Sequence, residues 1–186
     1  SRKWDAVVIQ ERSLEAFDDP RGWRAGTEGI RDMAKAGGTE RFIYIETWAR
    51  HNQDVNYKTL PDRVGENYAQ QQAMLARVIA EHTDALKLEK APVGTAWARL
   101  YPKMRLHADT NHTNVAGSYL VSLIIHRALQ PSVRAKDVTW APGSLDQDTA
   151  ALLRAEADAA FASAKAASAK SPEEPEESAA SEDASA

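Results

Sequence analysis

Two residues in the second half of the chain could act together as a general base. Asp109 and His112 lie three residues apart in a polar segment that leads into an apolar run, a pattern that predicts a loop entering a helix. At this spacing both side chains can lie on one side of the loop, and the carboxylate can accept a hydrogen bond from one ring nitrogen. That bond would fix the tautomer and leave the other nitrogen free to accept a proton.

The same pattern has a purely structural alternative. Asp109 or Asn111 could cap the helix that follows, with His112 as polar surface. An aspartate and a histidine three residues apart occur often by chance, so the spacing alone favours the structural alternative.

Four segments, in order along the chain, resemble segments of the SGNH/GDSL hydrolase family. Asp109 and His112, with the sequence AGSYL that follows at 116–120, resemble the terminal block of that family. The sequence DAVVIQERS at 5–13 resembles a central strand and the turn after it. ETWA, which begins at Glu46, resembles the next strand end, and APVGTAW, which begins at Ala91, resembles the segment before the catalytic loop.

The resemblance implies a flavodoxin-like, three-layer α/β/α sandwich with a parallel sheet. It also implies hydrolysis of carboxylic esters by a Ser-His-Asp mechanism, without a metal or another cofactor. His112 would be the general base and Asp109 its orienting partner. Gln10, at the end of the central strand, is the candidate donor to the oxyanion, where many relatives use an asparagine.

The motif that supplies the nucleophilic serine in this family is absent, because neither Gly-Asp-Ser nor Gly-Asn-Ser occurs in the sequence. The first two strands of the expected sheet are also missing. We therefore identify no nucleophile and expect a segment outside this chain to supply it. The alternative is a non-catalytic SGNH-like binding or accessory domain.

Two serines lie near the motif strands. Ser13 follows the same strand as Gln10 and could face the site, although a structural role in the turn is the commoner outcome. Ser118 lies inside the helix after His112, from which it cannot easily reach the ring.

The elements that must position these residues alternate between strands and helices, which predicts an α/β sandwich with a parallel sheet. Functional side chains then lie at the carboxyl ends of the strands. The first strand is short, apolar and continuous, so we expect helices to cover both of its faces. The predicted strands are 4–10, 41–45 and 86–93; the predicted helices are 28–36, 63–82, 94–100, 113–129 and 146–167; residues 11–27 and 50–61 are predicted loops.

Composition indicates one globular domain followed by a tail. The resemblance implies that residues 1–168 form an SGNH-like α/β domain, incomplete at its N-terminus, and the composition of residues 169–186 predicts a disordered acidic tail rich in Ala, Ser and Glu. The chain has no cysteine, which excludes a disulfide framework, a thiolate metal site and a cysteine nucleophile. The composition does not indicate a compartment.

Charge argues against nucleic acid as a partner. Six of the 27 acids and none of the 23 bases lie in residues 171–186, so the remaining residues carry 23 bases against 21 acids, and no Lys/Arg cluster stands out. No apolar run reaches the roughly 18 residues that a membrane span needs. The expected partner is a small-molecule or carbohydrate ester.

Four further histidines lack metal-ligand spacing and are predicted to be solvated: His51, His82, His107 and His126.

Overall fold

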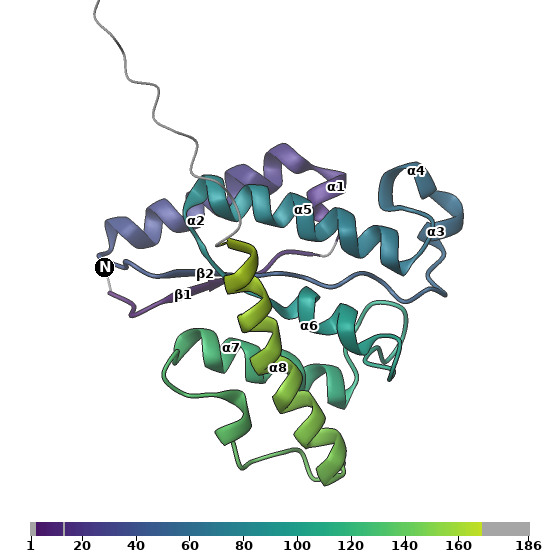
Figure 1. Cartoon of the computed structure of the whole chain (residues 1–186). Helices are drawn as coiled ribbons and strands as arrows, with labels where there is room; N and C mark the ends of the chain where they lie inside the picture. The colour runs from purple at the N-terminus through teal and green to yellow at the C-terminus, as the bar shows by residue number, and fades with distance from the viewer. Residues whose placement is uncertain (1–2, 13, 169–186) are drawn as a thin grey trace, which may run out of the picture.

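A computed structural model describes residues 3–12 and 14–168 of the chain. Three parallel strands form one sheet in the order β1 (Val7–Ile9), β2 (Phe42–Ile45) and β3 (Glu89–Ala91). Helices lie on both sides of this sheet (Figure 1). The predicted α/β sandwich with a parallel sheet is therefore confirmed.

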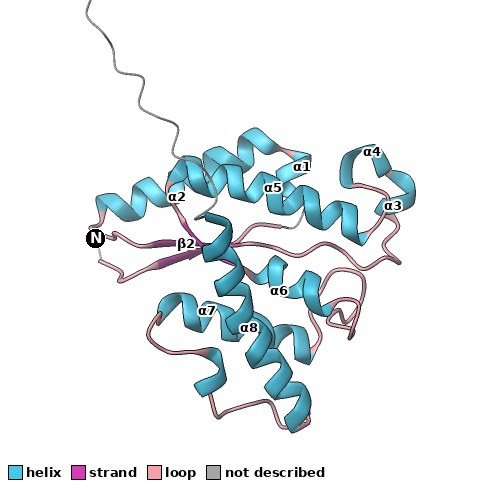
Figure 2. Ribbon diagram, in the orientation of Figure 1, coloured by secondary structure: helices cyan, strands magenta, loops and turns pink. Residues whose placement is uncertain are grey.

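The order of the strands decides which helices cover which face. The sheet grows in one direction, from β1 through α2 (Pro20–Ala36) to β2 and through α5 (Tyr68–Leu86) to β3. Right-handed crossovers in one direction place both connecting helices on the same face. The chain after β3 then covers the opposite face with α6 (Val93–Leu100), α7 (Val115–Leu129) and α8 (Gln147–Ser168) (Figure 2).

The prediction of loops over 11–27 and 50–61 is wrong. The first range contains α1 (Glu15–Asp18) and the start of α2, and the second contains α3 (Asn56–Thr59) and the first residue of α4 (Pro61–Val64). The start of α2 has a simple physical cause. Asp19 caps the helix by accepting a bond from the Gly22 amide at 2.9 Å, and proline occupies the first helical position, where it loses no hydrogen bond.

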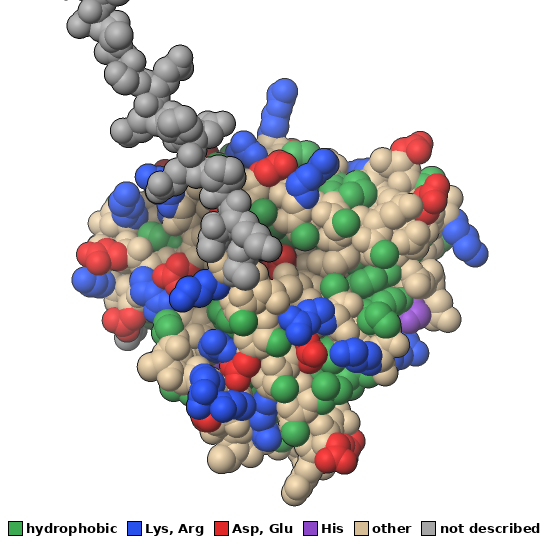
Figure 3. Space-filling view, viewed as in Figure 1, with side chains coloured by type: hydrophobic (Ala, Val, Ile, Leu, Met, Phe, Trp, Pro, Cys, Tyr) green, Lys and Arg blue, Asp and Glu red, His purple; other side chains and the backbone are tan. Residues whose placement is uncertain are grey.

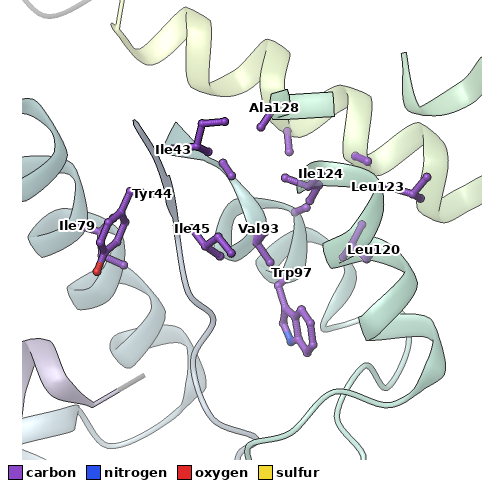
Figure 4. Packing of buried hydrophobic residues seen from close by; sticks show 14 of the residues in the cluster. Ile43, Tyr44, Ile45, Ile79, Val93, Trp97, Leu120, Leu123, Ile124 and Ala128 are labelled. Carbon is purple, nitrogen blue, oxygen red and sulfur yellow. The ribbon is translucent and has the colours of Figure 1, made fainter. Parts of the chain in front are cut away.

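The core lies on both faces of β2. Ile43 points toward α7, where Ile124 and Ala128 lie, whereas Tyr44 points to the other side, toward Ile79 of α5 (Figure 4). Ile43 and Tyr44 are completely buried. The central strand is thus apolar on both faces because helices cover both.

The outer strand β1 is less buried than we predicted. Val8 is 37% exposed, although Ile9 beside it is buried. The register pairs Val8 with Ile43, so the two side chains lie on the same face of the sheet. On that face α7 packs against β3, at the opposite edge of the sheet. Coverage of both faces therefore applies to β2 and is wrong for β1.

The surface carries charges of both signs. Figure 3 shows basic and acidic side chains interspersed over one face of the molecule. Within the described ranges, no helix combines the length and the apolar character required to cross a bilayer.

Candidate functional site

The segment around Asp109 is a closed loop that ends at the start of α7. His107 and Thr113 form an isolated antiparallel bridge, and the Ala108 amide donates to the His112 carbonyl at 2.8 Å. Asn114 caps α7, because its Oδ1 accepts a bond from the amide three residues later at 2.9 Å. The cap is therefore Asn114, and the structural alternative in which Asp109 caps this helix does not apply.

Asp109 and His112 are hydrogen-bonded, with 2.7 Å between Asp109 Oδ2 and His112 Nδ1. The other carboxylate oxygen, Oδ1, accepts bonds from the backbone amides of Asn111 and His112, both at 2.7 Å. The carboxylate thus holds the ring and the loop backbone at once. Within residues 3–12 and 14–168, no group is hydrogen-bonded to Nε2 of His112.

Hydrogen bonds lower the pKa of Asp109 far below its ordinary value. The side-chain bond from His112 is the largest cause, followed by the two backbone amides. Both side chains are exposed, Asp109 by 56% and His112 by 77%. Asp109 is therefore ionised at neutral pH and can accept a hydrogen bond from Nδ1–H of the imidazole.

His112 borders a hollow of about 290 Å³ at the carboxyl ends of β1 and β2. Gln10, which is exposed, lines the same hollow, so the fold brings together the predicted base and the predicted oxyanion donor. Asp109 contacts His112 but does not itself line the hollow. The residues that line it are Gln10, Glu11, Arg12, Thr47, Trp48, Asn111, His112 and Thr113.

Hydrogen bonds tie the loop after β2 to the Asp109 loop. Trp48 donates from Nε1 to the Asn111 carbonyl at 3.1 Å, and the His51 amide donates to the Thr110 carbonyl at 2.8 Å. Trp48 also stacks on the fully buried Trp97 of α6, with ring centroids 4.5 Å apart. These contacts fix where the Asp109 loop lies relative to the sheet, and they make Trp48 a wall of the hollow.

Two of the histidines that we predicted to be solvated are buried. His107 bonds the Ala49 carbonyl at 3.0 Å, and His82 packs against Trp23 with ring centroids 4.1 Å apart and the ring planes tilted by 35°. Desolvation lowers the pKa of both rings. The prediction rested on charged neighbours in sequence. On helix α5 such neighbours can point to solvent while His82 points inward.

Glu11 is a site residue that the sequence analysis missed. Burial raises the pKa of its carboxyl to about 8, and a hydrogen bond from Trp23 Nε1 only partly offsets this. Trp23 Nε1 also contacts the hydroxyl of the buried Tyr44 at 2.7 Å. Glu11 Oε1 is buried and has no partner in the described part of the chain. Most Glu11 carboxyls are therefore neutral at pH 7. The only signal in the sequence is an acid directly after a predicted strand.

The nucleophile remains unassigned. Ser13 lies outside the described residues, although Arg12 beside it lines the hollow. Ser118 is exposed on α7, and its hydroxyl bonds that of Thr113 at 2.6 Å. No serine of the described ranges is hydrogen-bonded to His112. In the same ranges, no group of three or more Asp, Glu, His or Cys side chains could hold a metal ion.

A second, larger hollow of about 620 Å³ lies between α5 and α6 and is mostly apolar. It contains neither Asp109 nor His112 and shares no residue with the hollow beside them. Its apolar lining would favour it as a binding site, but His112, the proposed base, borders the smaller hollow, which we therefore take as the candidate active site.

Comparison with known proteins adds information on the fold. No protein-family model matches this chain, and no curated protein matches its sequence. The solved structure of a DUF4886 family protein from Bacteroides uniformis is similar, with a TM-score of 0.71 at 15% sequence identity. The match covers 87% of this chain and 63% of that protein, so the chain spans less than two thirds of its length. At this identity the likeness shows a shared fold and does not extend to activity.

Proposed function

We propose that this chain carries the base and the orienting carboxylate of an SGNH-type ester hydrolase. In this proposal the nucleophilic serine comes from a segment that is not in this chain. The observation that carries the proposal is the 2.7 Å bond between Asp109 and His112, in a closed loop beside a hollow that Gln10 also lines. The resemblance to SGNH hydrolases supplies the reaction class.

The proposed reaction assigns one step to each residue. Asp109 accepts a hydrogen bond from Nδ1–H of His112 and stays ionised, so Nε2 is free to remove the proton of the serine hydroxyl as its oxygen attacks the ester carbonyl. Gln10 donates a hydrogen bond to the oxyanion that forms. His112 then gives the proton to the departing alcohol. Water hydrolyses the acyl-enzyme with the same histidine as the base.

The alternative function is a non-catalytic binding or accessory domain of the same lineage. Two observations favour it: the high exposure of the Asp109 and His112 side chains, and the absence of a serine bonded to His112 in the described ranges. An exposed pair is screened by water and orients the ring less firmly than a buried one.

Hydrolysis of p-nitrophenyl acetate tests the proposal on two forms, the chain as printed and the chain extended upstream by its own coding sequence. We expect saturable turnover only in the extended form. His112→Ala should lower kcat by about 10³-fold or more. His126→Ala is the matched control, because His126 is an exposed histidine of α7 that does not line the hollow. No turnover in either form would favour the accessory domain.

Ser13 has its own test on the printed chain. If that chain hydrolyses the ester and Ser13→Ala abolishes the activity, the nucleophile lies within this sequence and the assignment to an outside segment is wrong. If the printed chain is inactive and the extended form is active, Ser13→Ala should leave the extended form active.

A further inference from the structure

Trp140 is largely exposed and held on a fixed backbone. The connector between α7 and α8 presents it with 67% of its surface exposed. Its carbonyl accepts a bond from the Tyr119 hydroxyl at 2.7 Å and from Arg154 Nη2 at 3.2 Å. The Tyr119 ring lies edge-on to the indole, with centroids 6.0 Å apart. The two donors hold the backbone under a bulky apolar ring that faces water.

The indole forms one wall of a shallow groove of about 560 Å³. The groove combines apolar surface with hydroxyl and amide groups, and no charged side chain lines it. Thr113 lines both this groove and the hollow beside His112, so the two are neighbours. The residues of the groove are Ala108, Thr113, Asn114, Val115, Ser118, Tyr119, Ser122, Trp140 and Pro142.

We infer that the groove binds a neutral sugar unit of an acylated oligosaccharide or polysaccharide, with Trp140 as the stacking platform. A sugar ring has an apolar C–H face that can pack on an indole, and hydroxyls around its rim. The hydroxyls of Ser118 and Ser122 each make one bond within the protein and retain capacity for another. An ionic ligand would find no counter-charge among the groove residues.

The inference deepens the proposed function by naming its substrate class. The claim that the bound sugar carries the acyl group to be cleaved rests on that function, whereas the claim that a sugar binds does not. A sugar unit bound on Trp140 would place an acyl group of the same or the next unit toward the hollow that His112 borders. Sugar binding itself requires no catalysis, so it can be measured alone.

Binding is tested by NMR on the five indole N–H signals of the printed chain. The probes are xylohexaose, cellohexaose and mannohexaose. We expect at least one to shift the Trp140 signal with a roughly millimolar dissociation constant, and Trp140→Ala to weaken binding by roughly tenfold or more. Trp4→Ala is the matched control, since Trp4 is also exposed, by 51%, and does not line the groove. A Trp140 signal that none of the three moves, or unchanged binding by Trp140→Ala, would overturn the inference.

A kinetic comparison separates this inference from the proposed function. In the extended form, Trp140→Ala should lower kcat/KM for acetylated xylohexaose by roughly tenfold more than for p-nitrophenyl acetate. Sugar binding without any hydrolysis would support the platform and contradict the esterase. Equal losses on both esters would contradict a role of Trp140 in placing a sugar. Sedimentation gives the remaining control. If the chain forms a dimer that Trp140→Ala dissociates, and no sugar binds, the groove would instead be the contact with a second copy of the chain.

Discussion

Asp109 illustrates how one side chain can serve two purposes. One carboxylate oxygen orients the His112 ring and the other accepts two backbone amides of the same loop. Ring orientation and loop shape are therefore linked through a single group. A substitution that removes both oxygens would therefore change both.

Asp109→Asn tests this link in the extended form. We expect kcat for p-nitrophenyl acetate to fall by about 10²- to 10⁴-fold, because an amide cannot hold the imidazole in the productive tautomer as an ionised carboxylate does. Asp137→Asn is the control, since Asp137 is another exposed aspartate, whose carboxylate pairs with Arg134. Equal activities of the two variants would contradict the assigned role of Asp109.

Glu11 predicts a dependence of stability on pH. Its carboxyl has a pKa of about 8 in the fold against an ordinary value of 4.5, so the folded protein retains a proton that the unfolded chain releases. The free energy of unfolding therefore falls as pH rises from 4.5 through 8. A tenfold change in proton affinity is worth about 1.4 kcal/mol, so the loss across this range is on the order of a few kcal/mol.

Glu11→Gln removes the titration and retains an acceptor for Trp23. We expect its stability in urea to resemble that of the unsubstituted chain near about pH 5 and to exceed it near about pH 9. Glu89→Gln, which changes an acid on the surface of β3, provides the comparison. Parallel pH profiles for Glu11→Gln and the unsubstituted chain would show that Glu11 is ionised in the fold at neutral pH.

At the scale of elements, the candidate site depends on how closely α7 approaches the segment before it. A Cβ on Gly117 would lie 2.4 Å from the Leu106 carbonyl and 2.7 Å from the Trp97 ring. Only glycine permits this contact, which brings the first turn of α7 against the Asp109 loop. The sequence shows a glycine here, but the neighbours it meets lie 11 and 20 residues earlier.

Gly117→Ala should lower the free energy of unfolding by about 1–3 kcal/mol, because the added methyl must displace backbone or a buried ring. Gly26→Ala is the matched control. Gly26 lies in the exposed interior of α2 with no atom within 4 Å of an added Cβ, so alanine there should stabilise by about 0.5–1 kcal/mol. Urea denaturation measures both. The same sign for both variants would contradict the close approach.

The sequence predicted local features of the site better than contacts between distant segments. The bond between Asp109 and His112 was predicted from their spacing of three residues together with the resemblance of the surrounding segment to SGNH hydrolases. The environment of Glu11 could not be predicted, because it depends on Trp23, which α2 carries back over the sheet. The exposure of Val8 likewise depends on which strand lies at the edge, and a hydrophobic pattern does not contain strand order.

For the whole molecule, the described chain forms one sandwich with a contiguous core that includes residues from β1 to α8. Helix α8 contributes Ala150, Leu153 and Ala157 to that core, so the folded unit reaches at least that far. The α/β class followed from the alternation of strand and helix patterns. That the two connecting helices, α2 and α5, lie on the same face could be inferred only once the order of the strands was known.

Deletion of 169–186 tests the predicted boundary of the domain. These residues lie outside the described part of the chain, and their sequence, with no aromatic or β-branched residue, provides little surface for a core. We expect the melting temperature to remain within experimental error of that of the full chain. A clear fall would show that the last residues stabilise the domain.

The contact between Trp23 and Glu11 also has an optical consequence. When Glu11 loses its proton, a negative charge appears beside the pyrrole end of a buried indole. Excitation moves electron density in indole away from that end, so the charge stabilises the excited state and shifts emission to longer wavelength. In a variant that retains Trp23 as its single tryptophan, fluorescence would therefore report the ionisation of Glu11 directly, as a titration centred at about pH 8.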